Sequence, residues 1–309
     1  MNPYSYPAVE PYFNLRLKET TKSWLRYVVD FPIAKPTRYY KESNIARGEL
    51  FRPREGHTGP LAILIHGWGD DSVIPCKLLA KALVKRGVAS FILYLVFHSS
   101  RMPEAMRGKG LHLSPEEWFE GYQTSVIDIR QIVDWATSRG EINKEQIAVI
   151  GISLGGIIAA ISMGVDKRIS AGVFLVTGGN FENPAWLKEK RDSHKEAEHS
   201  EAQERYAQYL AEVAEKGVEN VTPSKKSYLT DPLTFASYLR KRPVMMINAL
   251  WDESISRQAT LDFWEACGKP AIRWFPATHT TIWLWYPFIR RKITNFLTSA
   301  FGIERRESI

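Results

Sequence analysis

One serine of this chain lies in a setting that favours nucleophilic chemistry. Residues 151–156 read GISLGG, a Gly-x-Ser-x-Gly pattern with Ser153 at its centre. Five apolar or small residues precede Ser153 at 147–151, and the apolar run 157–163 follows it. These runs predict a buried strand and a packed helix joined by a tight turn. A serine on such a turn is held out from the sheet, where its hydroxyl can attack a carbonyl group.

The two glycines of the pattern fit the crowding of such a turn. A Cβ atom at Gly151 or Gly155 would collide with neighbouring backbone, and glycine has none. We expect Ser153 to take a strained backbone conformation there. Leu154 opens the helix that follows. Because amides at a helix N-terminus stabilise negative charge, we expect the Leu154 N–H to face the oxyanion formed by serine attack.

The rest of the chain predicts an α/β fold that positions this turn. Apolar runs predict strands near residues 48–53, 61–65, 89–96, 171–176, 244–250 and 271–275. Helical spacing predicts helices near 75–86, 115–138, 257–267 and 289–301. Because strands and helices alternate, we expect a mostly parallel central sheet covered by helices on both faces.

Two segments fall outside this alternation. Residues 1–44 form an N-terminal extension with a predicted helix near Leu15–Val29, which covers a sheet edge or packs beside the active-site mouth. Residues 179–232 interrupt the core, which is predicted over 45–178 and 233–309. Within this charged insert, Glu198–Glu215 predicts an amphipathic helix. The insert is too long for a simple loop, so we expect a helical cap over the carboxyl edge of the sheet. The alternative is a surface helical hairpin with no part in binding.

Composition excludes several classes of protein. The chain has 309 residues, of which 44% are hydrophobic and 24% charged, values typical of globular proteins. The net charge of +7 is scattered without a basic block, so we predict no nucleic-acid partner. The two cysteines form no disulfide framework. With no signal-peptide pattern and no run of 18 apolar residues, we predict a cytoplasmic protein without a membrane span.

The sequence indicates no metal ion and no cofactor. No spacing of His, Cys and carboxylate residues is typical of a metal site. No Gly-x-Gly-x-x-Gly pattern follows a strand, and there is no phosphate loop. Of the other histidines, His66 is expected to shape the loop after the second strand. His98 follows a strand end and is expected either to line the substrate pocket or to make a local hydrogen bond.

Four motifs in order resemble those of the α/β-hydrolase superfamily over about residues 45–302. They are residues 66–69 (HGWG) after an early strand, residues 151–156 at the turn, Asp252 after a late strand and His279 after the last strand. Residues 141–147 (EINKEQI) look like the acyl-peptidase, dienelactone-hydrolase and acetyl-esterase branches. The resemblance implies the α/β-hydrolase fold, a catalytic triad and an oxyanion hole. The triad would be Ser153, Asp252 and His279, and the hole would use the backbone N–H groups of Trp68 and Leu154.

Each residue type suits the role that the resemblance implies. A serine is a weak nucleophile at neutral pH and needs a base, which His279 would supply. Asp252 would hold the imidazole in the required tautomer. Glu253 and Asp231 are competing carboxylates. Asp252 is preferred because it follows the 244–250 run almost directly and precedes His279 by enough chain for one helix and one strand.

The predicted function is hydrolysis of carboxylic esters by a serine carboxylesterase through an acyl-enzyme on Ser153, with a small-molecule ester as the substrate and the size of its acyl group left open. Aromatic residues flank the catalytic loops and suggest an apolar pocket, with substrate contacts expected at His98, Trp251 and Trp283. One alternative is a serine peptidase of the prolyl-oligopeptidase type, although the chain lacks a propeller-sized domain. The other is a non-catalytic binding protein, which would not need an ordered triad. The sequence does not indicate an oligomeric state.

Overall fold

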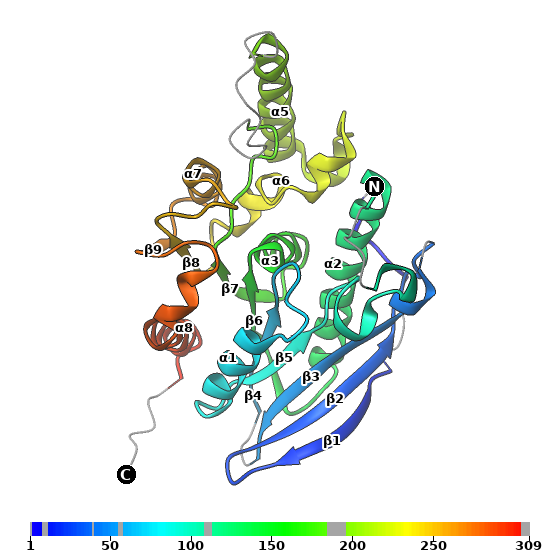
Figure 1. Cartoon of the computed structure of the whole chain (residues 1–309), viewed down its shortest axis with the longest axis vertical. Helices are drawn as coiled ribbons and strands as arrows, with labels where there is room; N and C mark the ends of the chain where they lie inside the picture. The colour runs from blue at the N-terminus through cyan, green and yellow to red at the C-terminus, as the bar shows by residue number, and fades with distance from the viewer. Residues whose placement is uncertain are drawn as a thin grey trace.

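The computed structural model describes residues 2–7, 12–38, 40–54, 58–107, 113–183 and 196–303. Within these ranges nine strands form one sheet, in the order β1-β2-β3-β5-β4-β6-β7-β8-β9 (Figure 1). Neighbouring strands from β5 to β9 are parallel, whereas β1, β2 and β3 pair antiparallel. The strands are β1 (Asn14–Thr20), β2 (Trp24–Pro32), β3 (Ile45–Pro53), β4 (Gly59–Ile65), β5 (Ala89–Leu93), β6 (Ile142–Ile152), β7 (Ile169–Leu175), β8 (Val244–Ala249) and β9 (Ala271–Phe275).

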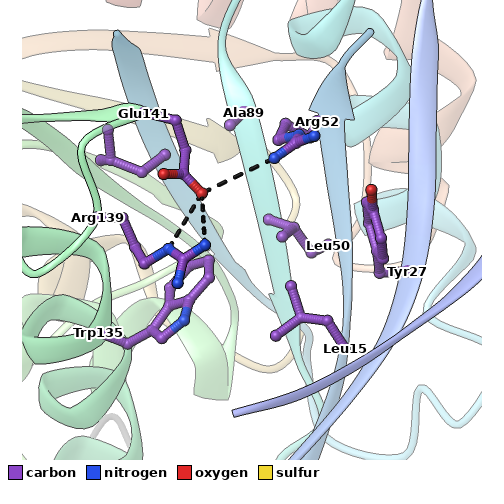
Figure 2. Close-up of a pocket in the computed structure, with 9 residues that line it drawn as sticks. Leu15, Tyr27, Leu50, Arg52, Ala89, Trp135, Arg139 and Glu141 are labelled. Atoms are coloured by element: carbon purple, nitrogen blue, oxygen red, sulfur yellow. Dashed lines mark hydrogen bonds and ion pairs between the residues drawn. The ribbon is translucent and has the colours of Figure 1, made fainter. Parts of the chain in front are cut away.

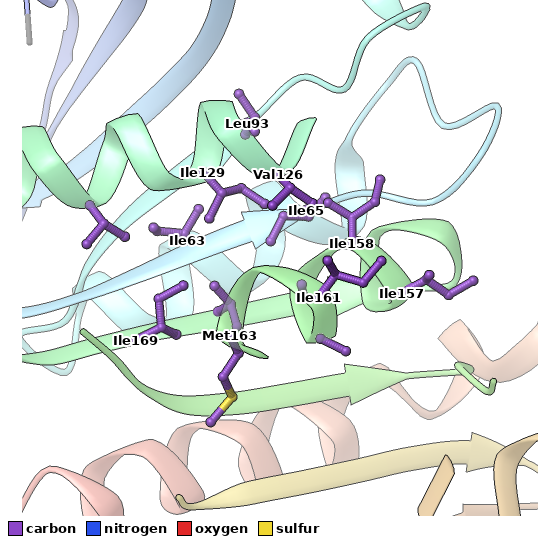
Figure 3. Packing of buried hydrophobic residues seen from close by; sticks show 14 of the residues in the cluster. Ile63, Ile65, Leu93, Val126, Ile129, Ile157, Ile158, Ile161, Met163 and Ile169 are labelled. Carbon is purple, nitrogen blue, oxygen red and sulfur yellow. The ribbon is translucent and has the colours of Figure 1, made fainter. Parts of the chain in front are cut away.

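Helices cover both faces of this sheet, which confirms the predicted architecture. They are α1 (Ile74–Val84), α2 (Pro115–Thr137), α3 (Leu154–Val165), α5 (Glu196–Lys216), α6 (Leu233–Ala236), α7 (Arg257–Ala266) and α8 (Tyr286–Ala300). Successive side chains of a strand point to opposite faces. Accordingly, Ile63 and Ile65 of β4 join the buried cluster that includes α2 and α3, whereas Leu64 joins the cluster that includes α1 and α8. Figure 3 shows the first of these clusters between β4 and the two helices.

The helix predicted near Leu15–Val29 is wrong. This segment forms the hairpin of β1 and β2, in which Leu15 pairs with Val29 and Thr20 with Leu25. The Thr21 hydroxyl closes the turn by accepting a hydrogen bond from the Trp24 amide at 3.0 Å. β2 then pairs along its whole length with β3. Pairing with a neighbouring strand therefore decided the structure, and the extension lengthens the sheet instead of laying a helix on its edge.

The helix predicted in the insert is present as α5. Its residues Tyr206 and Tyr209 are buried, with their ring centroids 4.5 and 5.1 Å from the ring of Tyr228. All three belong to the apolar cluster that includes α2 and α3. In Figure 1, α5 projects from the body of the protein beyond α6. These tyrosines therefore anchor the insert to the core.

A cavity of about 190 Å³ lies at the amino ends of the parallel strands. Ala89 and Ile142, the first residues of β5 and β6, contribute to its wall. Figure 2 shows the Glu141 carboxylate at this cavity, between Arg52 at 3.8 Å and Arg139 at 3.0 Å. Because Ser153 follows the carboxyl end of β6, this cavity is at the opposite edge of the sheet from the serine.

A fully buried ion pair ties the N-terminal extension to the core. Arg101 and Asp128 have no solvent exposure, and the Arg101 Nη1 atom donates to the Asp128 carboxylate at 2.7 Å. The same guanidinium donates to the carbonyl oxygens of Tyr94 and Ser43, each at 2.9 Å. Ser43 lies two residues before β3, Tyr94 follows β5, and Asp128 belongs to α2. One side chain thus fixes three segments that are distant in sequence.

We expect Arg101→Met to lower the free energy of unfolding by about 3–5 kcal/mol, because it leaves the Asp128 carboxylate buried without its cation. Urea unfolding followed by circular dichroism would measure this loss. The matched control is Arg16→Met, which removes an exposed pair with Asp30 and should cost no more than about 1 kcal/mol. Equal losses in the two variants would contradict the role assigned to the buried pair.

Candidate active site

Ser153 occupies the sharp turn between β6 and α3, with φ 53° and ψ −119°. Its amide donates to the Leu175 carbonyl oxygen at 2.8 Å, which ties the turn to the end of β7. A Cβ atom at Gly151 would lie 2.1 Å from the Gly155 carbonyl oxygen, and one at Gly155 would lie 2.4 Å from that of Ile65. Both positions therefore exclude any side chain. The packing of this turn holds the serine in a conformation that few non-glycine residues adopt.

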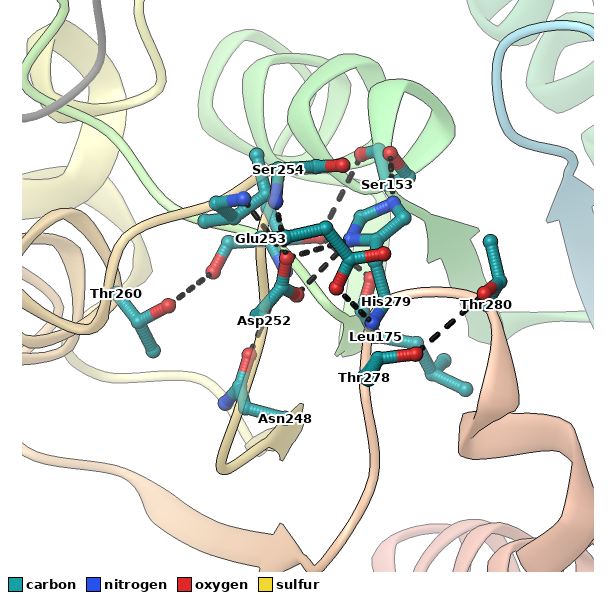
Figure 4. Close-up of polar contacts among 12 residues, drawn as sticks. Ser153, Leu175, Asn248, Asp252, Glu253, Ser254, Thr260, Thr278, His279 and Thr280 are labelled. Carbon is teal, nitrogen blue, oxygen red and sulfur yellow. Dashed lines mark hydrogen bonds and ion pairs between the residues drawn. The ribbon is translucent and has the colours of Figure 1, made fainter. Parts of the chain in front are cut away.

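The structure brings Ser153 together with His279 and Asp252 at the carboxyl edge of the sheet (Figure 4). The His279 Nε2 atom lies 2.9 Å from Ser153 Oγ, and Nδ1 lies 2.9 Å from both carboxylate oxygens of Asp252. A carboxylate can only accept, so Nδ1 carries the proton and Nε2 is left to accept from the hydroxyl. The His279 and Asp252 side chains are only 16% and 7% exposed, so water competes little for these contacts.

Backbone amides hold the Asp252 carboxylate in place. Its Oδ1 atom accepts from the amides of Ser254 at 2.9 Å and Ile255 at 2.8 Å. These bonds fix the short side chain at the end of β8, where it reaches the ring of His279 after the end of β9. The carboxylate is therefore oriented by the chain itself, independently of the histidine.

The two competing carboxylates have other partners. Glu253 is exposed, and its Oε2 atom accepts from the backbone amide of His279 at 3.0 Å. Asp231 is buried and accepts from the amides of Asn180, Phe181 and Leu233 at 3.1, 2.6 and 2.9 Å. Burial raises the pKa of Asp231 to about 6, against the lowering effect of these bonds. From the sequence, Glu253 is only an alternative to Asp252 as the partner of the His279 ring. In the structure Glu253 instead binds the backbone amide of His279.

The loop after β4 lies against the serine. A Cβ atom built on Gly67 would stand 3.5 Å from the Cβ atom of Ser153, so the residue that precedes Trp68 lies against the serine. Leu154 opens α3, and the first amides of a helix have no acceptor within it. The loop and the helix N-terminus therefore approach Ser153 from neighbouring strands.

His66 is part of this loop and is completely buried. Its Nδ1 atom donates to the Gly67 carbonyl oxygen at 2.8 Å, and its Nε2 atom accepts from the Leu95 amide at 3.0 Å. Burial, with the nearby His98, lowers the pKa of His66 to about 4. The ring is therefore neutral and shapes the loop, as the sequence indicated.

His98 is 1% exposed, and both its ring nitrogens bind backbone groups. Nδ1 donates to the Val96 carbonyl oxygen at 2.8 Å, and Nε2 accepts from the Gly69 amide at 3.0 Å. The substrate contact expected at His98 does not fit this burial. The Val96 bond is local, as in the other expectation, whereas the Gly69 bond joins His98 to a loop 29 residues away in the sequence.

Aromatic side chains lie in the segments that follow β4, β8 and β9. Trp251 directly precedes Asp252 and is 64% exposed, and Trp283 is half-buried in the short 3₁₀ helix η8 (Thr281–Trp285) that follows His279. In the loop after β4, Trp68 packs against Trp118 of α2, with ring centroids 4.8 Å apart. The sequence predicts Trp118 only as part of the helix near 115–138. Its place in the first turn of α2 was the signal that it could lie at the sheet edge.

The described ranges hold no group of three or more His, Cys, Asp or Glu side chains that could bind a metal ion. Cys76 and Cys267 are buried as free thiols, and burial raises the pKa of both. No described helix is long and apolar enough to cross a membrane.

Comparison with known proteins adds the family context. A family model described as alpha/beta hydrolase domain containing 18 matches residues 33–178, a range that includes Ser153 and the 66–69 loop. A comparison with curated proteins finds no match to this sequence.

Solved structures resemble the chain over nearly its whole length. An acetyl xylan esterase from Paenibacillus sp. R4 is 18% identical with a TM-score of 0.68, covering 94% of this chain and 90% of its own. Acetyl xylan esterase 1 from Thermoanaerobacterium sp. JW/SL YS485 is 12% identical with a TM-score of 0.66, covering 96% and 91%. A cold-adapted esterase from an Arctic intertidal metagenomic library is 17% identical with a TM-score of 0.59, covering 91% and 96%. At these identities the shared property is the fold. With the sheet order of the chain, this likeness shows that the protein has the α/β-hydrolase fold.

Proposed function

We propose that this protein is a serine esterase that hydrolyses small carboxylic esters through an acyl-enzyme on Ser153. The observation that supports this most directly is the pair of 2.9 Å contacts from His279, one to Ser153 and one to Asp252. A histidine that contacts a serine hydroxyl through one ring nitrogen and a carboxylate through the other can activate that hydroxyl for acyl transfer.

The first half of the proposed reaction forms the acyl-enzyme. His279 Nε2 removes the proton from Ser153 Oγ as the oxygen attacks the ester carbonyl carbon. Asp252 stabilises the imidazolium that results, without itself taking the proton. The tetrahedral intermediate collapses when its C–O bond to the alcohol breaks. The imidazolium gives its proton to the departing alcohol, and Ser153 keeps the acyl group.

The second half returns the free enzyme. Water takes the place of the alcohol, and His279 removes its proton as the water oxygen attacks the acyl carbon. The second tetrahedral intermediate releases the carboxylic acid, and the proton returns to Ser153 Oγ. In both halves the negative charge develops on the carbonyl oxygen, and we assign its stabilisation to the backbone N–H groups of Trp68 and Leu154.

We propose short-chain esters as the substrate class. Two of the structural relatives are named as acetyl xylan esterases. The Trp68 and Trp118 rings pack together next to Gly67, which lies against Ser153, and we assign both rings to the acyl pocket. Trp251 and Trp283 are the proposed contacts on the side of His279. Residues 179–232 are proposed as a cap at the carboxyl edge, anchored through Tyr206 and Tyr209. Two buried free thiols suit a reducing compartment such as the cytoplasm.

Ser153→Ala should abolish the turnover of p-nitrophenyl acetate and labelling by a fluorophosphonate, since it removes the nucleophile. Loss of a triad serine lowers kcat by about 10⁶-fold in a serine protease, so no activity should remain measurable. Intact mass should show one adduct on the wild-type protein. Ser254→Ala, a change to an exposed serine next to the triad, is the control and should label normally. Efficient labelling of Ser153→Ala would place the nucleophile elsewhere, and an inert wild-type protein would favour a binding function.

Asp252→Asn should lower kcat by about 10⁴-fold, because an amide keeps the shape but supports the wrong imidazole tautomer. The matched control is Glu253→Gln, which keeps an oxygen that can accept from the His279 amide and should stay within about tenfold of wild type. Steady-state kinetics on p-nitrophenyl acetate compares the two. If Glu253→Gln loses activity while Asp252→Asn keeps it, the assignment of the acid is wrong.

Trp118→Ala should raise the kcat/KM for p-nitrophenyl butyrate relative to acetate, because it removes the ring that backs Trp68. The change in this ratio should lie within about 10–200-fold, the range that a methylene or two confers in a pocket. Trp264→Ala is the control. This ring lies on α7, where its indole N–H donates to the Pro270 carbonyl oxygen, and its loss should leave the ratio unchanged. If the butyrate-to-acetate ratio of kcat/KM is the same in Trp118→Ala as in the wild type, Trp118 does not line the acyl pocket.

A further inference from the structure

Three hydrogen bonds connect the loop after β4 with the loop after β5. The Leu95 amide donates to His66 Nε2 at 3.0 Å, the Gly69 amide donates to His98 Nε2 at 3.0 Å, and the Ser99 amide donates to Asp71 Oδ1 at 2.5 Å. The central one comes from the residue directly after Trp68. Two of these bonds hold residues 69–71, the Gly69–His98 bond and the Ser99–Asp71 bond. Since His98 is buried and Asp71 is exposed, the Gly69–His98 bond is the better protected from water.

The backbone around His98 is held in an unusual conformation. Phe97 and Ser99, on either side of it, have φ angles of 66° and 51°, in the left-handed region that side chains disfavour. Such residues persist where the surrounding structure fixes them. Arg101 contributes to this, because it ends the 3₁₀ helix η2 (Ser99–Arg101) and its buried guanidinium binds both Asp128 and the Tyr94 carbonyl oxygen. His98 is therefore presented to Gly69 from a fixed base.

The His98 ring also supports the Trp68 side chain. Its centroid lies 4.9 Å from that of Trp68, with the rings nearly perpendicular at 84°, and Trp68 also packs against Trp118. Nδ1 donates to the Val96 carbonyl oxygen, so the Nε2 atom has the lone pair that the Gly69 amide requires. The imidazole of His98 therefore contacts both the Gly69 amide, which follows Trp68 in the chain, and the Trp68 ring.

We propose that His98 is a positioning residue, which holds the loop 66–71 so that the Trp68 N–H points at the oxyanion formed on Ser153. This inference rests on the proposed esterase function. His98 contacts neither the nucleophile nor the developing charge; it acts through the Gly69 amide and the Trp68 ring. Its loss should therefore affect the transition state more than the binding of the substrate.

The experiment compares His98→Gln, whose side-chain oxygen can accept from the Gly69 amide, with His98→Leu, which has similar bulk and no acceptor. The first measurement is amide hydrogen exchange over residues 66–71, with residues 147–151 of β6 as the internal reference for global folding. Exchange in 66–71 should accelerate by at least about tenfold in His98→Leu and by less than about threefold in His98→Gln, with β6 unchanged in both. If His98→Leu does not fold, His98→Asn replaces it, because that side chain is too short to reach Gly69.

The second measurement is the separation of kcat from KM on p-nitrophenyl acetate. His98→Leu should lower kcat by about 10²-fold, at the lower end of the loss caused by removing an oxyanion donor, with KM nearly constant. His98→Gln should recover most of kcat. A purely structural role would instead lower the melting temperature of both variants without separating their kcat values.

Either measurement can overturn the proposal. Unchanged exchange in 66–71 of His98→Leu would show that His98 does not hold the loop, whatever the activity of the protein. Faster exchange with unchanged kcat would show that His98 holds the loop but that catalysis does not depend on this. A wild-type protein that turns over no ester would overturn the proposed function, and the exchange of 66–71 would then decide alone whether His98 holds the loop.

Discussion

The turn that carries Ser153 depends on the absence of two side chains. Because no Cβ atom stands at Gly151 or Gly155, the end of β6, the start of α3 and the end of β4 approach one another closely. This approach puts the serine at the point where three parallel strands end. It also places the loop after β4 beside the serine, so that a helix N-terminus and a loop amide can face the same small volume. The local packing and the proposed chemistry therefore have one cause.

The polar groups around this turn are organised mainly by backbone amides. Asp252 accepts from two of them, and Glu253 accepts from the amide of His279. On the other side, the rings of His66 and His98 each bind two backbone groups. Burial lowers the pKa of both histidines and keeps them neutral, which preserves the lone pairs that these bonds need. Fixed dipoles of this kind stabilise a developing charge without having to reorient.

The N-terminal extension supports this organisation from a distance. Its strands β1 and β2 lengthen the sheet beyond β3, and Ser43 accepts from the buried Arg101. Arg101 ends the short 3₁₀ helix η2 (Ser99–Arg101), which begins directly after His98. The extension is thus connected through the Arg101 guanidinium to the segment that carries His98.

The sequence by itself determined the fold core and the identity of the triad candidates. Glycine spacing around Ser153, apolar runs and the order of Ser, Asp and His depend on local sterics and on the succession of elements, and both can be read along the chain. The tertiary structure decided what depends on partners from elsewhere in the chain. Residues 15–29 became strands because β3 was available for pairing. His98 and Trp118 came to the loop beside Ser153, and Tyr206 and Tyr209 were buried against Tyr228, through contacts between distant segments. Periodicity records which face of an element is apolar, but it does not record which neighbour covers that face.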